Sequence, residues 1–452
     1  MKFRFRYSHF PMSNQFSFNQ RLLLGLTLFS MFFGAGNLIF PPYLGSLAGV
    51  DMPWAMAGFA ITAVCFPILG VMTVARSGGL MMLASRVHPQ FAFIFTLLIY
   101  LSIGPCVAIP RTASTSFEMA LAPLFTATTE PFFLDFSPLV CAQFLYSVFF
   151  FGLAGIMALN PEKLTQRLGK VTSPALIIMI ALLFLACLFR PIAGYGLALP
   201  PYDLNAFVRG FLEGYQTMDT LAALNFGLII ALNVQALGVS NTEGVVRETV
   251  KAGMIAGFFL ITIYLALAHI GATVGGAGLI TENGAQTLTS VAEIQFGSWG
   301  IILLGMIFFV ACLNTCVGLL SCCSDYFTKV FPALSYRGWL LVFVLCSMVV
   351  SNAGLTLILK LSIPVLMSIY PVALMLIILG LTHHFNQNFS KVYPLTITMT
   401  AIVSVAGALK DIGVDVPLLS HLPFYSIGLE WVTPALIGWV IGIFYSKRHP
   451  EI

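Results

Sequence analysis

The stretch from Phe32 to Pro42 places two glycines and an asparagine in the middle of an apolar run long enough to cross a lipid bilayer. Its sequence is Phe-Phe-Gly-Ala-Gly-Asn-Leu-Ile-Phe-Pro-Pro. Irregular backbone at membrane depth leaves N–H and C=O groups unpaired, which is tolerated only against protein, water or a bound solute. The sequence therefore predicts a broken membrane helix, and the break is a candidate binding site.

Apolar composition places the rest of the chain in a membrane as well. Of its 452 residues, 59% are hydrophobic and 8% are charged, and a chain of this kind cannot stay dissolved as a globule. Because about 20 apolar residues span a bilayer core, we predict an all-α polytopic membrane protein with twelve transmembrane helices. The predicted spans are 21–45, 53–75, 91–110, 139–159, 173–190, 204–238, 252–274, 298–322, 338–352, 354–381, 392–409 and 428–445.

Charge placement supports this count and orients the chain. With both termini inside, 16 of the 21 Lys and Arg residues fall on the cytoplasmic side, which is the side that such residues favour. We therefore predict a multi-pass protein of the inner (cytoplasmic) cell membrane with cytoplasmic tails at 1–20 and 446–452. The start of translation, at Met1 or Met12, is left open. The lipid bilayer is the expected partner; neither a nucleic acid nor an obligate protein partner is indicated.

Weak internal symmetry divides the spans. Several of them recur at an offset of roughly 190 to 200 positions, which relates a five-helix repeat over 21–190 to a second one over 204–381. Five spans per repeat insert the second copy upside down, and two extra helices follow over 392–445. The offset pairs the first break with a polar interruption at 214–219. Paired broken helices in inverted repeats point to a transporter site at the membrane midplane.

A broken helix offers both poles of its dipole to a ligand. We expect free N–H groups at Asn37 and Leu38 and free carbonyls near Ser30 and Phe33. The N–H groups suit a carboxylate, while the carbonyls suit an ammonium group or Na⁺. The Asn37 side chain adds an oxygen of the kind that hard cations prefer.

These residues also carry a family resemblance. The 32–42 motif resembles the first-helix signature of the bacterial branched-chain amino acid:cation symporters. Ser-Ile-Gly-Pro at 102–105 and Ala-Ile-Pro-Arg-Thr-Ala at 108–113 resemble that family's third helix and the residues after it. Phe-Leu-Glu-Gly-Tyr-Gln-Thr-Met-Asp at 211–219 resembles its sixth helix, and Pro364 with Tyr370 its tenth.

The resemblance implies a LeuT-like fold with a 5+5 inverted repeat and a site on its broken helices. The run Gly-Ala-Gly-Asn at 34–37, followed by Phe-Pro at 40–41, is also similar to the Gly-x-Gly-Asn-x-x-Arg-Phe-Pro signature of sodium-coupled symporters. Ile39 stands where that signature has arginine. The implied Na⁺ ligands are Ser30, Phe33, Ala311, Asn314 and Thr315, with a possible second Na⁺ at Asn37. The implied substrate contacts are Gly34, Ala35, Gly36, Asn37, Leu38, Tyr215, Thr217, Met218 and Asp219, beside an apolar pocket that includes Phe33 and Phe226.

Two charged positions allow several roles. Asp219 lies at the centre of a membrane helix, where a carboxylate costs about 2.5 to 3.5 kcal/mol and is usually functional. It can cap the half-helix that follows, contact substrate or cation, or carry a proton, and capping is the interpretation we favour. For Arg111 and Glu118 we expect a salt bridge or solvation rather than transport chemistry.

The combined hypothesis is a secondary active symporter that imports leucine, isoleucine or valine with Na⁺ by alternating access, with no cofactor beyond this coupling ion. One alternative is an H⁺-coupled carrier of apolar or aromatic amino acids that uses Asp219. A second is an intramembrane enzyme. An enzyme would need convergent catalytic groups, and the sequence contains neither a His-Glu-x-x-His run nor a serine with a histidine at comparable depth.

Overall fold

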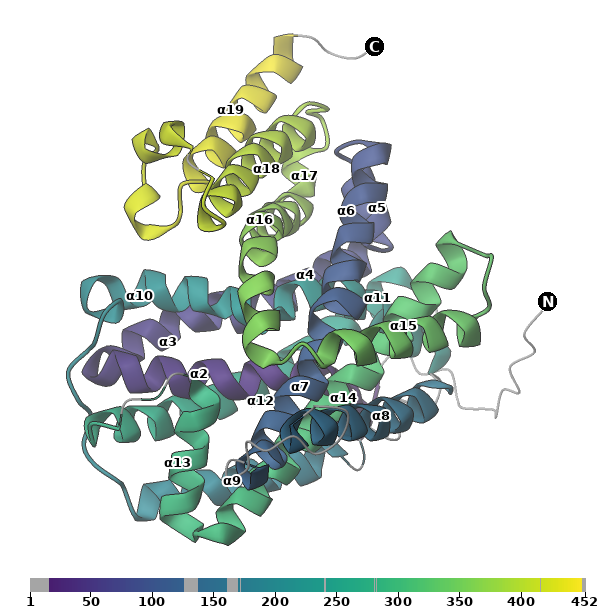
Figure 1. The fold of residues 1–452 in the computed structure, drawn as a ribbon. Coiled ribbons are helices and arrows are strands. Elements are labelled where there is room, and N and C mark those ends of the chain that lie inside the picture. Colours follow the sequence, from purple (N-terminus) through teal and green to yellow (C-terminus); the bar gives the residue numbers. More distant parts are fainter. Residues whose placement is uncertain are drawn as a thin grey trace.

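A computed structural model describes residues 16–125, 137–160, 170, 172–239, 241–279, 281, 283–414 and 416–448. Every regular element within these ranges is a helix (Figure 1). Both candidate start methionines and the last four residues lie outside the described ranges. The all-α class predicted from composition is therefore confirmed for the part of the chain that the structure describes.

Helices lie in all twelve predicted spans, and eight helical segments among the described residues are long and apolar enough to cross a membrane. The helices in the spans are α1 (Phe18–Phe32) with α2 (Ala35–Ala48), α3 (Met52–Ala60) with α4 (Phe66–Ser77), α6 (Pro89–Leu101) with α7 (Ala108–Ala120), α8 (Pro138–Ala158), α9 (Ser173–Phe189), α10 (Tyr202–Glu213) with α11 (Asp219–Ala236), α12 (Thr242–Gly276), α14 (Ser298–Val330), α15 (Tyr336–Ser351), α16 (Leu355–Leu381), α18 (Val392–Asp411) and α19 (Val432–Arg448). The short helices α5 (Leu80–Ser85), α13 (Gly284–Phe296) and α17 (His383–Asn386) lie between spans.

The third span also contains an irregular turn, which the sequence analysis did not predict. A π-helical turn over Ser102–Cys106 separates α6 from α7, and Gly104 within it adopts non-helical angles (φ −88°, ψ −130°). Pro105 has no N–H to donate, so the helical hydrogen bonds cannot continue regularly there. The turn sets the direction of α7, the helix that carries Arg111.

Glycines bring α2 and α12 into direct contact. A Cβ at Gly45 would lie 2.0 Å from the Ala268 carbonyl oxygen, and one at Gly271 would lie 1.9 Å from the Pro42 carbonyl oxygen. The two backbones therefore touch at both points, as small residues permit in membrane helices. This packing fixes the half-helix that follows the first break.

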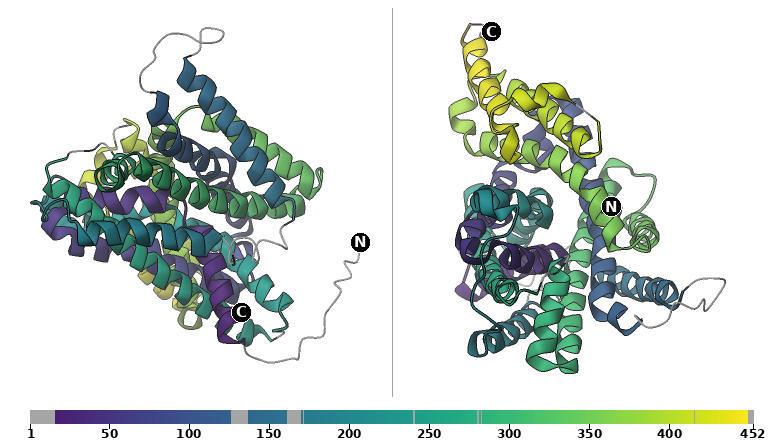
Figure 2. Two further views of the ribbon diagram at one scale, coloured as in Figure 1. Left: turned by 90° about the horizontal axis from the view of Figure 1, so that it is seen from below. Right: turned by 60° about the vertical axis from the view of Figure 1, so that its left-hand side comes forward.

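The last two helices form a layer of their own. Helix α18 packs against α16, and α19 packs against α18, on one side of the remaining helices (Figure 2). A Cβ at Gly438 would lie 2.9 Å from Thr396 Cα, and one at Gly442 would lie 2.6 Å from Val392 Cα. The glycine pair in α19 thus serves helix packing.

Candidate substrate and ion site

The first helix break lies within the predicted 32–42 motif. Helix α1 ends at Phe32, and only Phe33 and Gly34 separate it from α2. The Gly34 N–H turns to the Asn37 side chain, at 2.9 Å from Oδ1, instead of donating to Ser30 as in a continuous helix. The Leu38 N–H donates to the Gly34 carbonyl at 3.3 Å, so the expectation that it is free was wrong. The first turn of α2 leaves its orphan donors at residues 35–37 instead.

The second break lies where the sequence predicted it. Helix α10 ends at Glu213, a 3₁₀ turn covers Gly214–Thr217, and Met218 is left-handed at φ 65°. Helix α11 then begins at Asp219. The Asp219 side chain does not cap this helix, because Asp219 is the first helical residue and Met218 holds the cap position. The favoured interpretation of Asp219 as an N-cap was therefore wrong.

The Asp219 carboxylate joins the two breaks. Its Oδ2 accepts hydrogen bonds from Asn37 Nδ2 at 2.6 Å and from the Tyr264 hydroxyl at 2.9 Å. Asn37 also donates to the Tyr264 hydroxyl. All three side chains are buried. Sequence analysis missed Tyr264, although a tyrosine in the apolar centre of α12 was a usable signal.

A small cavity of about 30 Å³ lies where the breaks meet. That volume holds only about two water molecules. Seven of the predicted substrate contacts line it, namely Gly34, Ala35, Gly36, Asn37, Thr217, Met218 and Asp219. Leu38 and Tyr215 do not line it, and the Tyr215 ring stacks on Tyr370 with centroids 4.4 Å apart.

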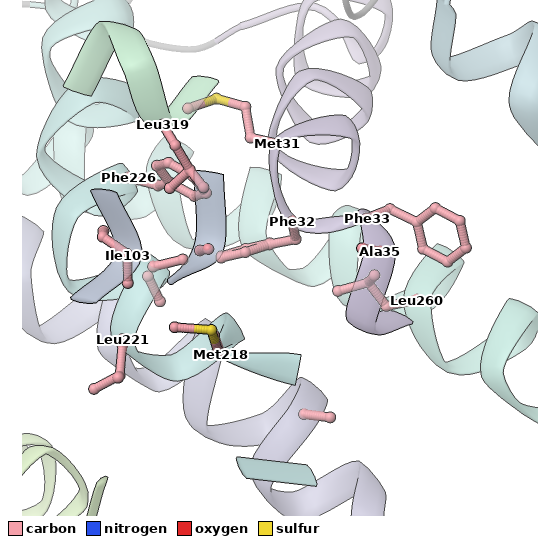
Figure 3. Packing of buried hydrophobic residues seen from close by; sticks show 14 of the residues in the cluster. Met31, Phe32, Phe33, Ala35, Ile103, Met218, Leu221, Phe226, Leu260 and Leu319 are labelled. Carbon is pink, nitrogen blue, oxygen red and sulfur yellow. The ribbon is translucent and has the colours of Figure 1, made fainter. Parts of the chain in front are cut away.

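The apolar wall differs from the one implied by the resemblance. Phe32 lines the cavity, whereas Phe33 does not, and the Phe33 ring extends away from Phe32 (Figure 3). Phe226 lies behind Phe32, with ring centroids 5.5 Å apart. The other apolar lining residues are Met31, Ile103, Ala108, Ala222 and Leu319.

Helix α14 places oxygen atoms beside the end of α1. Asn314 Nδ2 donates to Ser30 Oγ at 2.8 Å. The Asn314 Oδ1 and Thr315 Oγ1 atoms are buried without a hydrogen-bond partner in the described part of the chain. Thr315 also lines the cavity, and its Oγ1 lies 2.6 Å from the position of a Cβ at Gly34. Ala311 is fully buried one turn earlier. Unpaired buried oxygens are costly unless something binds them.

The Asn37 side chain is less available to a second cation than the sequence suggested, because both of its polar atoms already form hydrogen bonds. Its side-chain oxygen already accepts the Gly34 N–H, and its amide nitrogen is directed at Asp219 and Tyr264. The second Na⁺ site at Asn37 stays a prediction.

Arg111 lies at the cavity rather than in solvent. It is 3% exposed and lines the cavity from α7. Its Nη1 donates to the Gln216 carbonyl at 3.0 Å. No salt bridge joins Arg111 to Glu118, and both residues belong to the described ranges. The expected salt bridge or solvation of Arg111 was therefore wrong.

A larger chamber lies next to the cavity. This outer vestibule, on the side predicted to be extracellular, has a volume of about 570 Å³ and is lined by residues that include Phe40, Val208, Leu212, Gln216, Ile363 and Met367. On the side predicted to be cytoplasmic, Arg21 at the start of α1 pairs with the buried Glu248 of α12 at 2.5 Å. The cavity therefore lies between a wide chamber and an ion pair at the base of α1.

Helices broken around a polar cavity place the chain in the LeuT-like fold. The chain is similar to the solved structure of Mhp1, a nucleobase-cation-symport-1 family transporter, at a TM-score of 0.58 and 12% identity, over 95% of this chain and 93% of the other. It is likewise similar to MhsT in complex with L-phenylalanine, at a TM-score of 0.56 and 15% identity, over 94% and 98% of the two chains. The predicted fold class is confirmed.

The family follows from the sequence comparisons. The family model described as branched-chain amino acid transport protein matches residues 17–449. The branched-chain amino acid permease BrnQ of Bacillus subtilis (strain 168) is 39% identical over 442 residues, which cover 96% of this chain and 98% of the permease. The chain belongs to this family of branched-chain amino acid transport proteins. Its relatives are carriers and not enzymes, so the intramembrane enzyme is excluded.

Proposed function

We propose that the protein is a symporter that imports leucine, isoleucine or valine together with Na⁺ across the inner cell membrane. Family membership supports the substrate class. One observation supports the choice of Na⁺: beside the end of α1, Asn314 Oδ1 and Thr315 Oγ1 are buried without a hydrogen-bond partner in the described part of the chain. Carbonyl and hydroxyl oxygens are suitable ligands for a hard cation.

The proposed Na⁺ binds between α1 and α14. Its ligands are the backbone carbonyls of Ser30 and Phe33 together with the side chains of Asn314 and Thr315. The Ser30 carbonyl is available because the N–H that would have bonded it turns to Asn37. A cation held there ties the first half-helix to α14 and neutralises the negative end of α1.

Binding of Na⁺ and of the amino acid is coupled in this proposal. Thr315 lines the substrate cavity and belongs to the proposed Na⁺ site, so one side chain borders both ligands. If Na⁺ favours the arrangement that binds amino acid, the amino acid raises the affinity for Na⁺ by the same factor. The membrane potential adds about 2.3 kcal/mol per elementary charge moved through 100 mV.

The apolar wall of the cavity matches an aliphatic side chain. Met31, Phe32 and Leu319 provide a wall without charge. The cavity must widen from about 30 Å³ to admit an amino acid, and alternating access provides such a change. The side chain of the substrate is then recognised by burial, at about 0.8 kcal/mol per CH₂ group.

Transport in proteoliposomes tests the proposal. The purified protein is reconstituted, and leucine uptake is measured under a Na⁺ gradient alone and under a H⁺ gradient alone, at matched membrane potential. We expect uptake above the equilibrium level only with the Na⁺ gradient. Accumulation driven by H⁺ without Na⁺ would instead establish the proton-coupled alternative, with Asp219 as its candidate carrier. Aspartate and lysine serve as control solutes that the apolar wall should reject.

A further inference from the structure

Two opposite charges line the cavity without touching each other. Asp219 is 2% exposed and Arg111 is 3% exposed. Both belong to the lining, yet no salt bridge joins them among the described residues. Opposite charges buried in a membrane protein usually pair with each other. Here the space of the cavity is available to a ligand that carries both charges.

Arg111 is held against the first turn of α2. A Cβ at Gly36 would lie 2.9 Å from Arg111 Nη2, so the guanidinium passes directly over this glycine. The Gln216 carbonyl, in the second break, accepts from Nη1 and holds the group in place. A side chain at position 36 would displace the guanidinium from this place, and its Cβ would also lie 3.2 Å from both the Gln216 carbonyl oxygen and Thr217 Cα. Glycine at position 36 therefore lets the guanidinium and the backbone of the second break approach α2 closely.

The same place carries a second positive feature. Ala35, Gly36 and Asn37 of the first turn of α2 line the cavity, and a helix N-terminus, with its unpaired N–H groups, is equivalent to about half a positive charge. A guanidinium beside it adds a full charge. Two positive groups at one buried point repel each other unless an anion lies between them.

We propose that Arg111 binds the α-carboxylate of the transported amino acid, while Asp219 faces the α-ammonium group. The inference deepens the function proposed above and rests on it. Arginine suits this role because its planar fork bonds both oxygens of a carboxylate. The ligand class is therefore a free α-amino acid zwitterion with an aliphatic side chain. An amide or ester of the same amino acid lacks the anion that Arg111 requires.

Leucine and leucinamide form the probe pair, because they differ at the carboxylate and share the amine and side chain. Both are measured at about pH 6.5, below the α-amino pKa, so that both amines are charged. Inhibition of labelled leucine uptake into proteoliposomes, driven by Na⁺ added outside Na⁺-free vesicles, gives an apparent affinity for each. We expect the wild-type protein to prefer leucine by about 100-fold or more, as sites built around a polar group reject analogues that lack it.

The variants assign that preference to Arg111. We expect Arg111→Gln to lower the apparent affinity for leucine by about 10- to 100-fold and to leave the apparent affinity for leucinamide unchanged. The preference for leucine over leucinamide is then lost. Arg111→Lys keeps the positive charge and should retain part of the preference for leucine. Arg337→Gln, an exposed position on α15, is the matched control and should behave as wild type. If Arg111→Gln lowers the apparent affinity for both ligands equally, the proposal is overturned, because such a result indicates a purely structural role for Arg111.

Two further outcomes are separable. If Arg111→Gln does not fold, the proposal is tested by the preference for leucine over leucinamide in the wild type and in Arg111→Lys. Equal affinity of the wild type for the two ligands overturns the proposal. If the wild type takes up no leucine under a Na⁺ gradient, the proposed function fails. In that case the rise in melting temperature of the purified protein with each ligand still tests Arg111, and equal rises would reject its role.

Discussion

Each helix break leaves polar groups without the hydrogen bonds of a continuous helix, and the two breaks differ in how the polar groups around them are bonded. At the first break, Phe33 and Gly34 separate the half-helices, and the neighbouring oxygens of Asn314 and Thr315 have no partner in the described part of the chain. At the second break, Thr217 Oγ1 donates to the Gly214 carbonyl and the Thr220 N–H donates to the Tyr370 hydroxyl. Gln216 Oε1 is a buried atom of this turn that lacks a hydrogen-bond partner in the described part of the chain. We therefore expect the first break, where another helix brings two unpaired oxygens, to bind the cation, and the second to be held mainly by hydrogen bonds within the protein.

From this difference we expect the two breaks to have separate functions. Unpaired polar atoms near the first break gain most from a bound cation, so its geometry should depend on Na⁺. The second break carries Asp219 and should keep its form whether or not ligands are bound. Asp219 links the two because its carboxylate accepts the Asn37 amide from the other side.

The largest expected effect is that of Asp219→Asn, which removes the link. Hydrogen bonds to a charged group are worth about 1.5 to 3 kcal/mol each, and Asp219 accepts from both Asn37 and Tyr264. We expect leucine uptake to fall by at least about 100-fold, since a factor of ten corresponds to about 1.4 kcal/mol. Initial uptake rates in proteoliposomes measure this. Uptake close to wild type would show that the link is dispensable.

A smaller loss is expected from Gly34→Ala, which crowds the first break. The new Cβ would lie 2.6 Å from Thr315 Oγ1, and overpacking of this kind costs about 1 to 3 kcal/mol. We expect leucine uptake to fall by about 10- to 100-fold. Gly152→Ala in α8 is the matched control, because its Cβ would meet nothing within 4 Å. Similar behaviour of the two variants would contradict close packing at Gly34.

Thr315→Ala tests the unpaired oxygen itself. Loss of one oxygen ligand to a cation should cost about 1.5 kcal/mol, so the Na⁺ concentration for half-maximal leucine uptake should rise by about tenfold. Thr328→Ala, nearer the end of the same helix, is the control, since its hydroxyl bonds the Ser324 carbonyl at 2.7 Å. An unchanged Na⁺ dependence in Thr315→Ala would reject this residue as a ligand.

The smallest effect is expected at the second break, from Tyr370→Phe. It removes the hydroxyl that accepts the Thr220 N–H at 3.2 Å in the first turn of α11. We expect a loss of about 1 kcal/mol of stability, seen as a modest fall in melting temperature. The Na⁺ dependence of uptake should stay as in the wild type. A shift in Na⁺ affinity would show that the second break also takes part in cation binding.

Much of the fold was predictable because bilayer physics leaves few choices. Span length and charge placement located helices in all twelve spans, and the glycines at 34 and 36 and the polar run at 214–219 marked both breaks. The inverted repeat over 21–190 and 204–381 stays a prediction. The irregular turn at Gly104 was missed, although Pro105 beside it was a visible signal.

The site was less predictable because its contacts join distant parts of the chain. Asn37, Asp219 and Tyr264 belong to three helices, and no local pattern indicates that they meet. Arg111 was misjudged because only Glu118 stood near it in sequence, whereas its partner is the Gln216 carbonyl. Which of Phe32 and Phe33 lines the cavity depends on the exact residue at which α1 ends, and sequence patterns do not resolve helix ends that finely.

The unequal sizes of the outer vestibule and the cavity, about 570 Å³ and 30 Å³, have a pharmacological consequence. We expect a compound that is too bulky for the cavity but binds in the vestibule to block passage without displacing an amino acid already bound below. If it binds equally well with the cavity empty or occupied, its inhibition should be noncompetitive: the maximum rate falls while the apparent KM is unchanged. A screen based on displacement of bound leucine would overlook compounds of this kind, whereas a flux assay would detect them.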